Sequence, residues 1–260
     1  MLYDGTMIAS LPMYDWPELR EWTDLWWQGI AKHLGMDTPL TRQPDYMGLW
    51  NRSDLLFSQT CGYPFTHAFA GKLSLVATPH YSADGCDGPN YQSIVFARAG
   101  ARLEAFRGKR AAVNNPDSMS GMLALKLVFA PLASQGRFFG EVIETGGHVN
   151  SLTAVRDGRA DVCAIDAVCV GLARRHRPDL LDGLIEIARS PMVPGLPYVT
   201  VGGDVLELRK ALIRALGDPD LQNVRDHLLL SGQSVLSTRD YARITTLETA
   251  MEQAGGLNLL

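Results

Sequence analysis

The sequence predicts an α/β protein with two lobes, each a mostly parallel sheet flanked by helices, and two hinge crossings between the lobes. Stretches with strand and helix patterns alternate along most of the 260 residues. Residues 49–58 and 155–164 form a weak internal repeat, in which a helix end is followed by a basic residue, an aspartate and a hydrophobic strand. Two halves built alike predict two similar lobes, and a chain that crosses twice between lobes forms a hinge.

We expect the first lobe to be discontinuous. It comprises residues 1–97 plus 191–260, including the C-terminal helices, and residues 98–190 are inserted into it as the second lobe, which carries the candidate ligand site. The two crossings are expected near Arg98 and in the stretch 191–197, which contains three prolines.

The composition excludes several classes of protein. With 46% apolar and 20% charged residues, the chain is globular rather than disordered. A formal net charge of −4 argues against a general nucleic-acid or anionic-membrane surface, because both require a basic protein. The longest apolar runs are far shorter than a membrane span. The four cysteines show no C-x-x-C spacing, so we expect no metal and no cofactor.

Capping and turn signals place the elements of the first lobe. Asp15 is expected to cap a helix that has Pro17 in its first turn and ends at Gly35. Period-two and apolar runs predict strands at 6–11, 54–59, 73–77 and 92–98, and helices at 44–51 and 62–70. The stretch 79–90, rich in Gly, Asp and Pro, is expected to be a loop.

The same signals place the rest of the chain. Strands are predicted at 110–113, 140–144, 161–165, 184–188 and 198–201. Helices are predicted at 102–106, from Met119 onward, and at 151–157, 167–176, 204–216, 221–230 and 239–253. After the strand at 198–201, the chain is therefore expected to be entirely helical.

The polar loop before the helix that begins near Met119 is the candidate ligand site. The first N–H groups of a helix lack carbonyl partners and the helix dipole is positive there, so this end attracts an anion. Ser118 and Ser120 add hydroxyl donors to the N–H groups of Met119 to Gly121, and Gly121 leaves room for a ligand at the backbone. The alternative is that Asp117 or Ser118 merely caps an ordinary helix.

Further candidate ligand-binding residues lie at strand ends and in loops, where ligands of open α/β sheets gather. They are Tyr14, Gln59, Tyr63, Ser93, His148 and Asp166. We expect neutral hydrogen bonds from Gln59 and Ser93 in the first lobe, and a donor from His148 in a loop of the second. Asp166 either caps a helix or faces a cationic part of the ligand, on which Tyr14 and Tyr63 would stack.

Three motifs in order carry a family resemblance: 115–121 (Asn-Pro-Asp-Ser-Met-Ser-Gly), 147–152 with 155–161 behind it, and 189–194 (Arg-Ser-Pro-Met-Val-Pro). With them, the sequence resembles the phosphate/phosphonate-type substrate-binding proteins of ABC transporters over roughly residues 5–230. The resemblance implies the type II periplasmic-binding-protein fold.

The resemblance also implies roles for individual residues. Ser118, Ser120 and Gly121 match the family positions that bind phosphonate or phosphate oxygens, His148 matches the family histidine, and Tyr14 would match an aromatic residue of the first loop. The expected function is capture of a small oxyanion-bearing ligand, a phosphonate, phosphate ester or zwitterion, between two closing lobes, by a monomer that serves an ABC importer. The family is periplasmic, but residues 1–10 show no signal peptide, which predicts a cytoplasmic protein if the chain starts there.

Two other classes of function stay open. An enzyme on the same fold would use Cys61 or Cys163 as nucleophile and His148 as base, although neither cysteine lies in an activation motif. A cytoplasmic ligand sensor is the third class, favoured by the missing leader. Nucleotide-binding glycine motifs are absent from the sequence.

Overall fold

A computed structural model describes residues 7–259, which form two compact units. Unit 1 contains the residues up to 82 together with 195–238, and unit 2 contains 83–194 and the residues from 239 onward. The chain leaves unit 1 before the expected position near Arg98, because strand β6 (Ser93–Ala97) pairs with β9 and β10 of unit 2.

The C-terminal helix α9 (Thr238–Gln253) was expected in the first lobe but packs in unit 2 from its second residue onward. Its Arg243 side chain donates a hydrogen bond of 2.7 Å to the carbonyl of Met192. Leu257 and Leu259, which follow the helix, join the apolar core of unit 2. These contacts, rather than sequence order, decide where the helix belongs.

Unit 1 is built on a five-stranded sheet with the order β1-β2-β12-β3-β13. Its strands are β1 (Ile8–Ser10), β2 (Leu55–Gln59), β12 (Tyr198–Thr200), β3 (Ser74–Tyr81) and β13 (Leu230–Ser234). β1 and β2 are parallel, but β12 is antiparallel to β2 and β3, and β13 is antiparallel to β3. The sheet is therefore mixed and not mostly parallel. Because β12 is antiparallel to β3, the chain leaves unit 1 and re-enters it at the same edge of this sheet.

Strand β13 is a correction to the expected helix at 221–230. Helix α8 (Gln222–His227) ends earlier, and Leu229 takes a left-handed backbone conformation with φ of 58°. The apolar run from Leu228 to Leu230 fits a helix face and a strand equally well, and no Gly or Pro separates them. The residues from Leu230 onward form a strand because they pair with β3.

Unit 2 contains a second five-stranded mixed sheet, with the order β10-β6-β9-β7-β8. The strands besides β6 are β7 (Arg110–Val113), β8 (Glu141–Glu144), β9 (Val162–Asp166) and β10 (Ile185–Arg189). β7 runs parallel to β8 and β9, whereas β6 is antiparallel to β9 and β10. The expected loop at 79–90 instead contributes the end of β3, and β4 (Cys86–Asp87) and β5 (Asn90–Tyr91) form a small sheet with β11 (Val193–Pro194).

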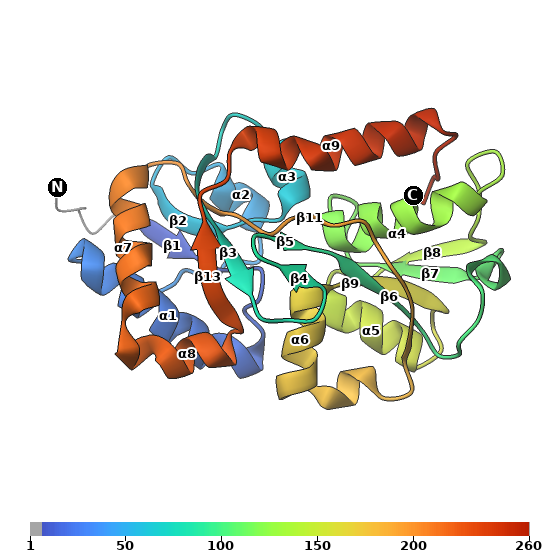
Figure 1. The fold of residues 1–260 in the computed structure, drawn as a ribbon, viewed down its shortest axis with the longest axis horizontal. Helices are drawn as coiled ribbons and strands as arrows, with labels where there is room; N and C mark the ends of the chain where they lie inside the picture. The colour runs from blue at the N-terminus through green and yellow to red at the C-terminus, as the bar shows by residue number, and fades with distance from the viewer. Residues whose placement is uncertain (1–6, 260) are drawn as a thin grey trace. The chain divides into compact units, whose positions relative to one another are not determined.

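Helices cover both sheets, and their ends follow local signals. In unit 1 they are α1 (Arg20–Leu34), α2 (Tyr46–Trp50), α3 (Gly62–Thr66), α7 (Val205–Gly217) and α8, with 3-10 turns at Pro17–Leu19 and Pro219–Leu221. α1 packs against α7 and α8 (Figure 1). Gly35 ends α1 with φ of 69°, as predicted.

In unit 2 the helices are α4 (Ala124–Phe129), α5 (His148–Arg156), α6 (Ala167–His176) and α9. A π-helical turn at Met119–Leu123 precedes α4, and 3-10 turns occupy Leu103–Phe106, Ala130–Leu132 and Pro178–Leu181. α6 has the predicted bounds. Within residues 7–259, no helix is long and apolar enough to cross a bilayer.

Candidate functional site

The candidate ligand site predicted from the sequence forms a strand, a loop and a helix in unit 2. β7 ends at Val113, and a continuous helical segment starts at Met119. Ser118 is the N-cap residue, and its Oγ accepts a hydrogen bond of 3.0 Å from the N–H of Gly121. The capping alternative is therefore correct for Ser118, and the Gly121 N–H that we expected to face a ligand is already used. A hydroxyl that accepts one bond still has its own proton to donate.

Gly121 is required by packing inside unit 2. A Cβ atom at this position would lie 1.8 Å from Asn114 Oδ1 and 3.3 Å from the Asn114 backbone nitrogen. Asn114 is itself buried, so it has little room to move away. The prediction explained this glycine by ligand approach, but the contact with Asn114 is a sufficient reason, because any larger side chain would force Asn114 or the helix start to shift.

His148 contacts the hydroxyl of Ser120, the second serine of the candidate ligand site. It is the first residue of α5 rather than part of a loop, which corrects the expected helix start at Ser151. Ser120 Oγ lies 2.8 Å from His148 Nε2. Burial lowers the pKa of His148 to about 4, so the imidazole is neutral at neutral pH. Ser120 is 4% exposed, and the pair is therefore largely protected from solvent.

Backbone hydrogen bonds connect the loop after β7 to the loop after β8, and they set the position of His148 relative to Ser120. The N–H of Thr145 donates to the carbonyl of Val113, and the N–H of Gly146 donates to the carbonyl of Asn114, both at 2.8 Å. Parallel strands end at the same edge of a sheet, so the two loops meet there. Ser118, Ser120, Gly121 and His148 are brought together in this way, and we call them the oxyanion cradle.

Ser93 and Asp166 lie opposite each other on paired strands of unit 2. Ser93 was predicted to act from the first lobe, and its position in β6 corrects this. Asp166 Oδ1 accepts hydrogen bonds from the N–H groups of Val168 at 2.7 Å and Cys169 at 3.4 Å. The capping alternative for Asp166 is thus realised, with a carboxylate that is 1% exposed.

In unit 1, Tyr14 and Gln59 line one cavity, whereas Tyr63 is not among its walls. Tyr63 instead stacks on His67, with ring centroids 3.8 Å apart. The cavity also includes Tyr81 and Tyr198, which the sequence did not single out. Tyr81 fell inside the expected loop 79–90, so no sequence signal singled it out, and in the structure it is the last residue of β3.

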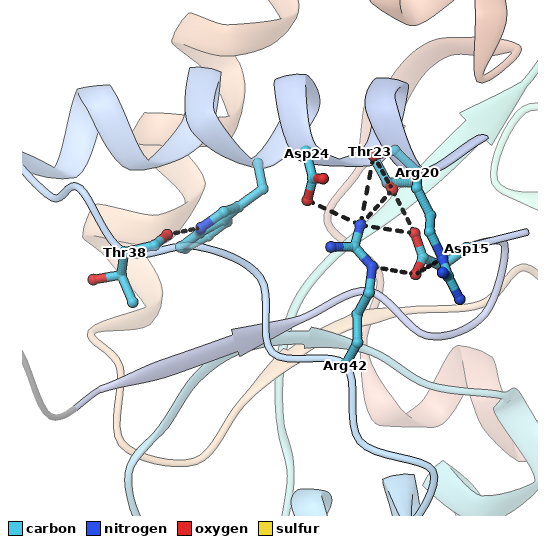
Figure 2. Close-up of polar contacts among 7 residues, drawn as sticks. Asp15, Arg20, Thr23, Asp24, Thr38 and Arg42 are labelled. Carbon is cyan, nitrogen blue, oxygen red and sulfur yellow. Dashed lines mark hydrogen bonds and ion pairs between the residues drawn. The ribbon is translucent and has the colours of Figure 1, made fainter. Parts of the chain in front are cut away.

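The loop that carries Tyr14 is held by a cluster of charged and polar groups (Figure 2). Asp15 was expected to cap a helix, but it accepts hydrogen bonds from Arg42 Nε and Thr23 Oγ1, each at 2.6 Å. The helical segment starts without a side-chain cap at Trp16. Arg42 also forms an ion pair of 2.9 Å with Asp24 of α1. The cluster ties the Tyr14 loop to α1.

Within residues 7–259, no three His, Cys, Asp or Glu side chains lie together in a way that could hold a metal ion. The cysteines proposed for an enzyme include Cys163, which is buried in β9, and burial raises the pKa of its thiol. A neutral buried thiol is a poor nucleophile. The chemistry that this site offers is hydrogen bonding by hydroxyls and a neutral imidazole.

Comparison with known proteins gives a family match over most of the chain. Residues 10–247 match the model of the periplasmic phosphonate substrate-binding proteins of ABC transporters. None of the curated proteins compared with the chain matches it.

Solved structures share the fold at low sequence identity. A binding protein component of an ABC phosphonate transporter from Pseudomonas aeruginosa has a TM-score of 0.76 and 17% identity, over 96% of this chain and 88% of that one. PhnD1 from Prochlorococcus marinus in complex with methylphosphonate has a TM-score of 0.74 and 12% identity, over 96% and 100%. XAC2383 from Xanthomonas citri bound to ATP has a TM-score of 0.69 and 16% identity, over 96% and 98%. These matches show the type II periplasmic-binding-protein fold.

Proposed function

This chain belongs to the family of periplasmic phosphonate substrate-binding proteins of ABC transporters, and from that premise we propose that its oxyanion cradle captures a small phosphonate-like anion for import. The single observation that carries the assignment to the cradle is the contact of 2.8 Å between Ser120 Oγ and His148 Nε2, beside the capping hydroxyl of Ser118.

The cradle binds through neutral donors. With its proton on Nε2, neutral His148 donates to Ser120 Oγ, and the Ser120 proton then points to the ligand. Ser118 Oγ accepts from the N–H of Gly121 and keeps its own proton available for the ligand. Hydrogen bonds to a charged group contribute roughly 1.5–3 kcal/mol each. Two hydroxyls therefore supply about 3–6 kcal/mol of the roughly 8 kcal/mol that a micromolar complex requires, and the positive end of the helical segment supplies more.

We propose that the protein binds its ligand without turnover. The matched family and the similar structures are binding proteins. An enzyme would need an activated nucleophile beside a base, but burial raises the pKa of Cys163 and His148 is hydrogen-bonded to Ser120. Family membership implies an ABC transporter membrane subunit as partner, and we further propose a monomer that does not bind nucleic acid. The ligand-sensor alternative stays a prediction.

Isothermal titration calorimetry with phosphate and methylphosphonate tests the proposal. The double variant Ser118→Ala/Ser120→Ala should lose roughly 10²–10⁴-fold in affinity, which corresponds to two charge-assisted hydrogen bonds. Ser134→Ala, at an exposed serine of unit 2, is the matched control and should bind as the parent does. Equal affinity of the double variant and the parent would rule out the cradle.

A thermal-shift screen identifies the ligand class independently. Phosphate, phosphonates, sulfate esters and amine-bearing zwitterions are tested in parallel. A ligand at 100 times its Kd should stabilise the parent by about 2.7 kcal/mol. The double variant Ser118→Ala/Ser120→Ala should show no such shift at the same concentration.

A further inference from the structure

The end of the unit 2 sheet opposite the oxyanion cradle is rich in arginine and lysine. The cradle follows the carboxyl ends of β7 and β8, whereas Arg110 begins β7 beside Glu141 of β8. Residues 98–110 contain five cations and one acid, although the whole chain carries 24 cations and 28 acids. The positive charge is therefore local, on a chain whose formal net charge is −4.

Hydrogen bonds bring two further arginines to this end of the sheet. The N–H of Gly140 donates to the carbonyl of Lys109 at 3.0 Å, so the turn that contains Arg137 lies beside it. Arg110 Nη2 donates at 2.9 Å to the carbonyl of the residue that precedes Arg159. We define the basic surface of unit 2 by its exposed cations, which are Arg102, Arg107, Lys109, Arg137 and Arg159.

Most of these cations have no partner inside the protein. Arg107 donates to the carbonyl of Leu132 and lies over the ring of Phe138, 4.8 Å from its centroid. Within residues 7–259, the other four side chains of the basic surface form neither a hydrogen bond nor an ion pair. Their charges are therefore available to an external anion.

The acids of the same region do not cancel this charge. Asp161 is engaged by two other arginines, Arg98 at 3.6 Å and Arg110 at 3.1 Å. The segments 98–110, 137–141 and 158–161 together contain seven cations and three acids, of which the other two are Glu104 and Glu141. An excess of positive charge remains on one surface of unit 2.

An exposed apolar side chain lies at the same end of the sheet. Ile185 pairs with Ala97, which directly precedes Arg98, and it is 46% exposed. A single exposed apolar residue is ordinary on a protein surface. Beside unpaired cations, however, it matches the membrane interface, where apolar side chains enter the acyl boundary and cations contact lipid phosphates. Four of the five cations are arginines, whose guanidinium groups fit phosphate oxygens.

We propose that the basic surface of unit 2, together with Ile185, binds the anionic phospholipid headgroups of a membrane. Family membership implies a partner that is embedded in a membrane, the ABC transporter. Attachment to the surrounding lipid raises the concentration of the binding protein near that partner. The inference goes beyond ligand capture and does not depend on it, because the cradle lies at the other end of the sheet.

Cosedimentation of the full chain with vesicles tests the proposal. Vesicles of phosphatidylcholine with about 30% phosphatidylglycerol should bind the protein at least roughly tenfold more tightly than vesicles of phosphatidylcholine alone. The difference should disappear in about 0.5 M NaCl, which screens surface charges. Equal binding to the two kinds of vesicle, or no binding to the anionic ones, would overturn the proposal.

A triple variant localises the binding. Arg102→Gln/Arg137→Gln/Arg159→Gln should lose at least roughly tenfold in affinity for the anionic vesicles, because each cation near such a membrane contributes about fivefold. Its thermal unfolding and its titration with methylphosphonate should match those of the parent. If the triple variant does not fold, the three single substitutions carry the same test, with an expected loss of about fivefold each.

A control variant removes the same net charge from unit 1. Lys32, Lys72 and Arg214 are exposed there, and Lys32→Gln/Lys72→Gln/Arg214→Gln should bind the anionic vesicles as the parent does. A loss as large as that of the unit 2 variant would show that only the total charge matters, and would overturn the proposal.

The apolar contact distinguishes a lipid surface from an acidic protein. Ile185→Ser should weaken vesicle binding about threefold, since less apolar area enters the interface. Ile213→Ser, at a residue of α7 that is 61% exposed, is its control and should have no effect. Binding to polyglutamate as tight as to the anionic vesicles, with Ile185→Ser neutral for both, would assign the surface to an acidic protein and overturn the lipid proposal.

Discussion

The oxyanion cradle of unit 2 and the cavity of unit 1 occupy equivalent positions in their sheets but have opposite chemistry. Each lies where parallel strands end. In the cradle, Ser118, Ser120 and a neutral His148 supply hydrogen-bond donors, and in the cavity the polar groups pair with one another and leave an apolar wall. The comparison teaches that the fold supplies the location, whereas the side chains decide the chemistry that is presented there.

The largest effect is expected from Gly121→Ala, which breaks the cradle without removing a polar group. The new Cβ would meet Asn114 Oδ1 at 1.8 Å, so the helix start or Asn114 must shift. We expect about 2–3 kcal/mol of lost stability by chemical denaturation, as for other overpacked cores. Gly217→Ala, whose Cβ would have no neighbour within 4 Å, is the control and should be nearly neutral. Similar free energies of unfolding for the two variants would contradict the packing role.

The next effect is a pH dependence that originates at His148. Its pKa is about 4 in the folded protein and 6.5 in the unfolded chain, so the unfolded chain binds the proton first as the pH falls. The stabilisation of the neutral imidazole is complete above about pH 6.5 and is lost progressively toward pH 4. Between pH 7.5 and 5.0 the loss should be about 2 kcal/mol.

His148→Gln should remove this part of the pH dependence, measured by urea denaturation at both pH values. Unit 1 provides the comparison, because burial also lowers the pKa of His80, which lies 2.8 Å from Ser234 Oγ. His80→Gln should therefore change the slope in the same direction. A parent protein whose stability stays level from pH 7.5 to 5.0 would show that His148 is not buried neutral.

A smaller effect is expected from Tyr198→Phe, which removes the hydroxyl that accepts a hydrogen bond from Trp26 beside the unit 1 cavity. Trp26 Nε1 loses its acceptor and stays buried, which should cost about 1–2 kcal/mol. A double-mutant cycle with Trp26→Phe isolates the pair. If the two substitutions are simply additive in the free energy of unfolding, the bond does not contribute.

The smallest effect concerns the cluster beside the cavity, shown in Figure 2. Arg42→Ala should cost about 0.5–1 kcal/mol, because Arg42 binds Asp15 and Asp24 at a partly exposed site. Arg52→Ala removes a more exposed partner of Asp54 in the same unit and should cost less stability than Arg42→Ala. Equal costs in thermal unfolding would mean that the cluster does not hold the Tyr14 loop more firmly than an ordinary surface ion pair.

The sequence by itself determined the features that depend on neighbouring residues. Gly35 ends α1, and α6 runs from Ala167 to His176, because left-handed glycines and Asp N-caps act within one helical turn. The strand, polar loop and helix of the cradle are fixed by the same short-range signals. Ser118 was identified correctly as a residue of the helix start for this reason, although both of its possible roles were open.

Only the tertiary structure decided the features that join distant segments. The run at Leu228 to Leu230 became a strand end because β3 offered a free edge, and Ser93 joined unit 2 because β6 pairs with β9. The unit 1 cavity draws its walls from four strands, the loop after β1, α1 and the end of α8, so no local pattern could predict it. Hydrogen-bond partners and apolar contacts between such segments form only when the sheet is assembled, and the local chemistry of each residue does not specify which partner it will meet.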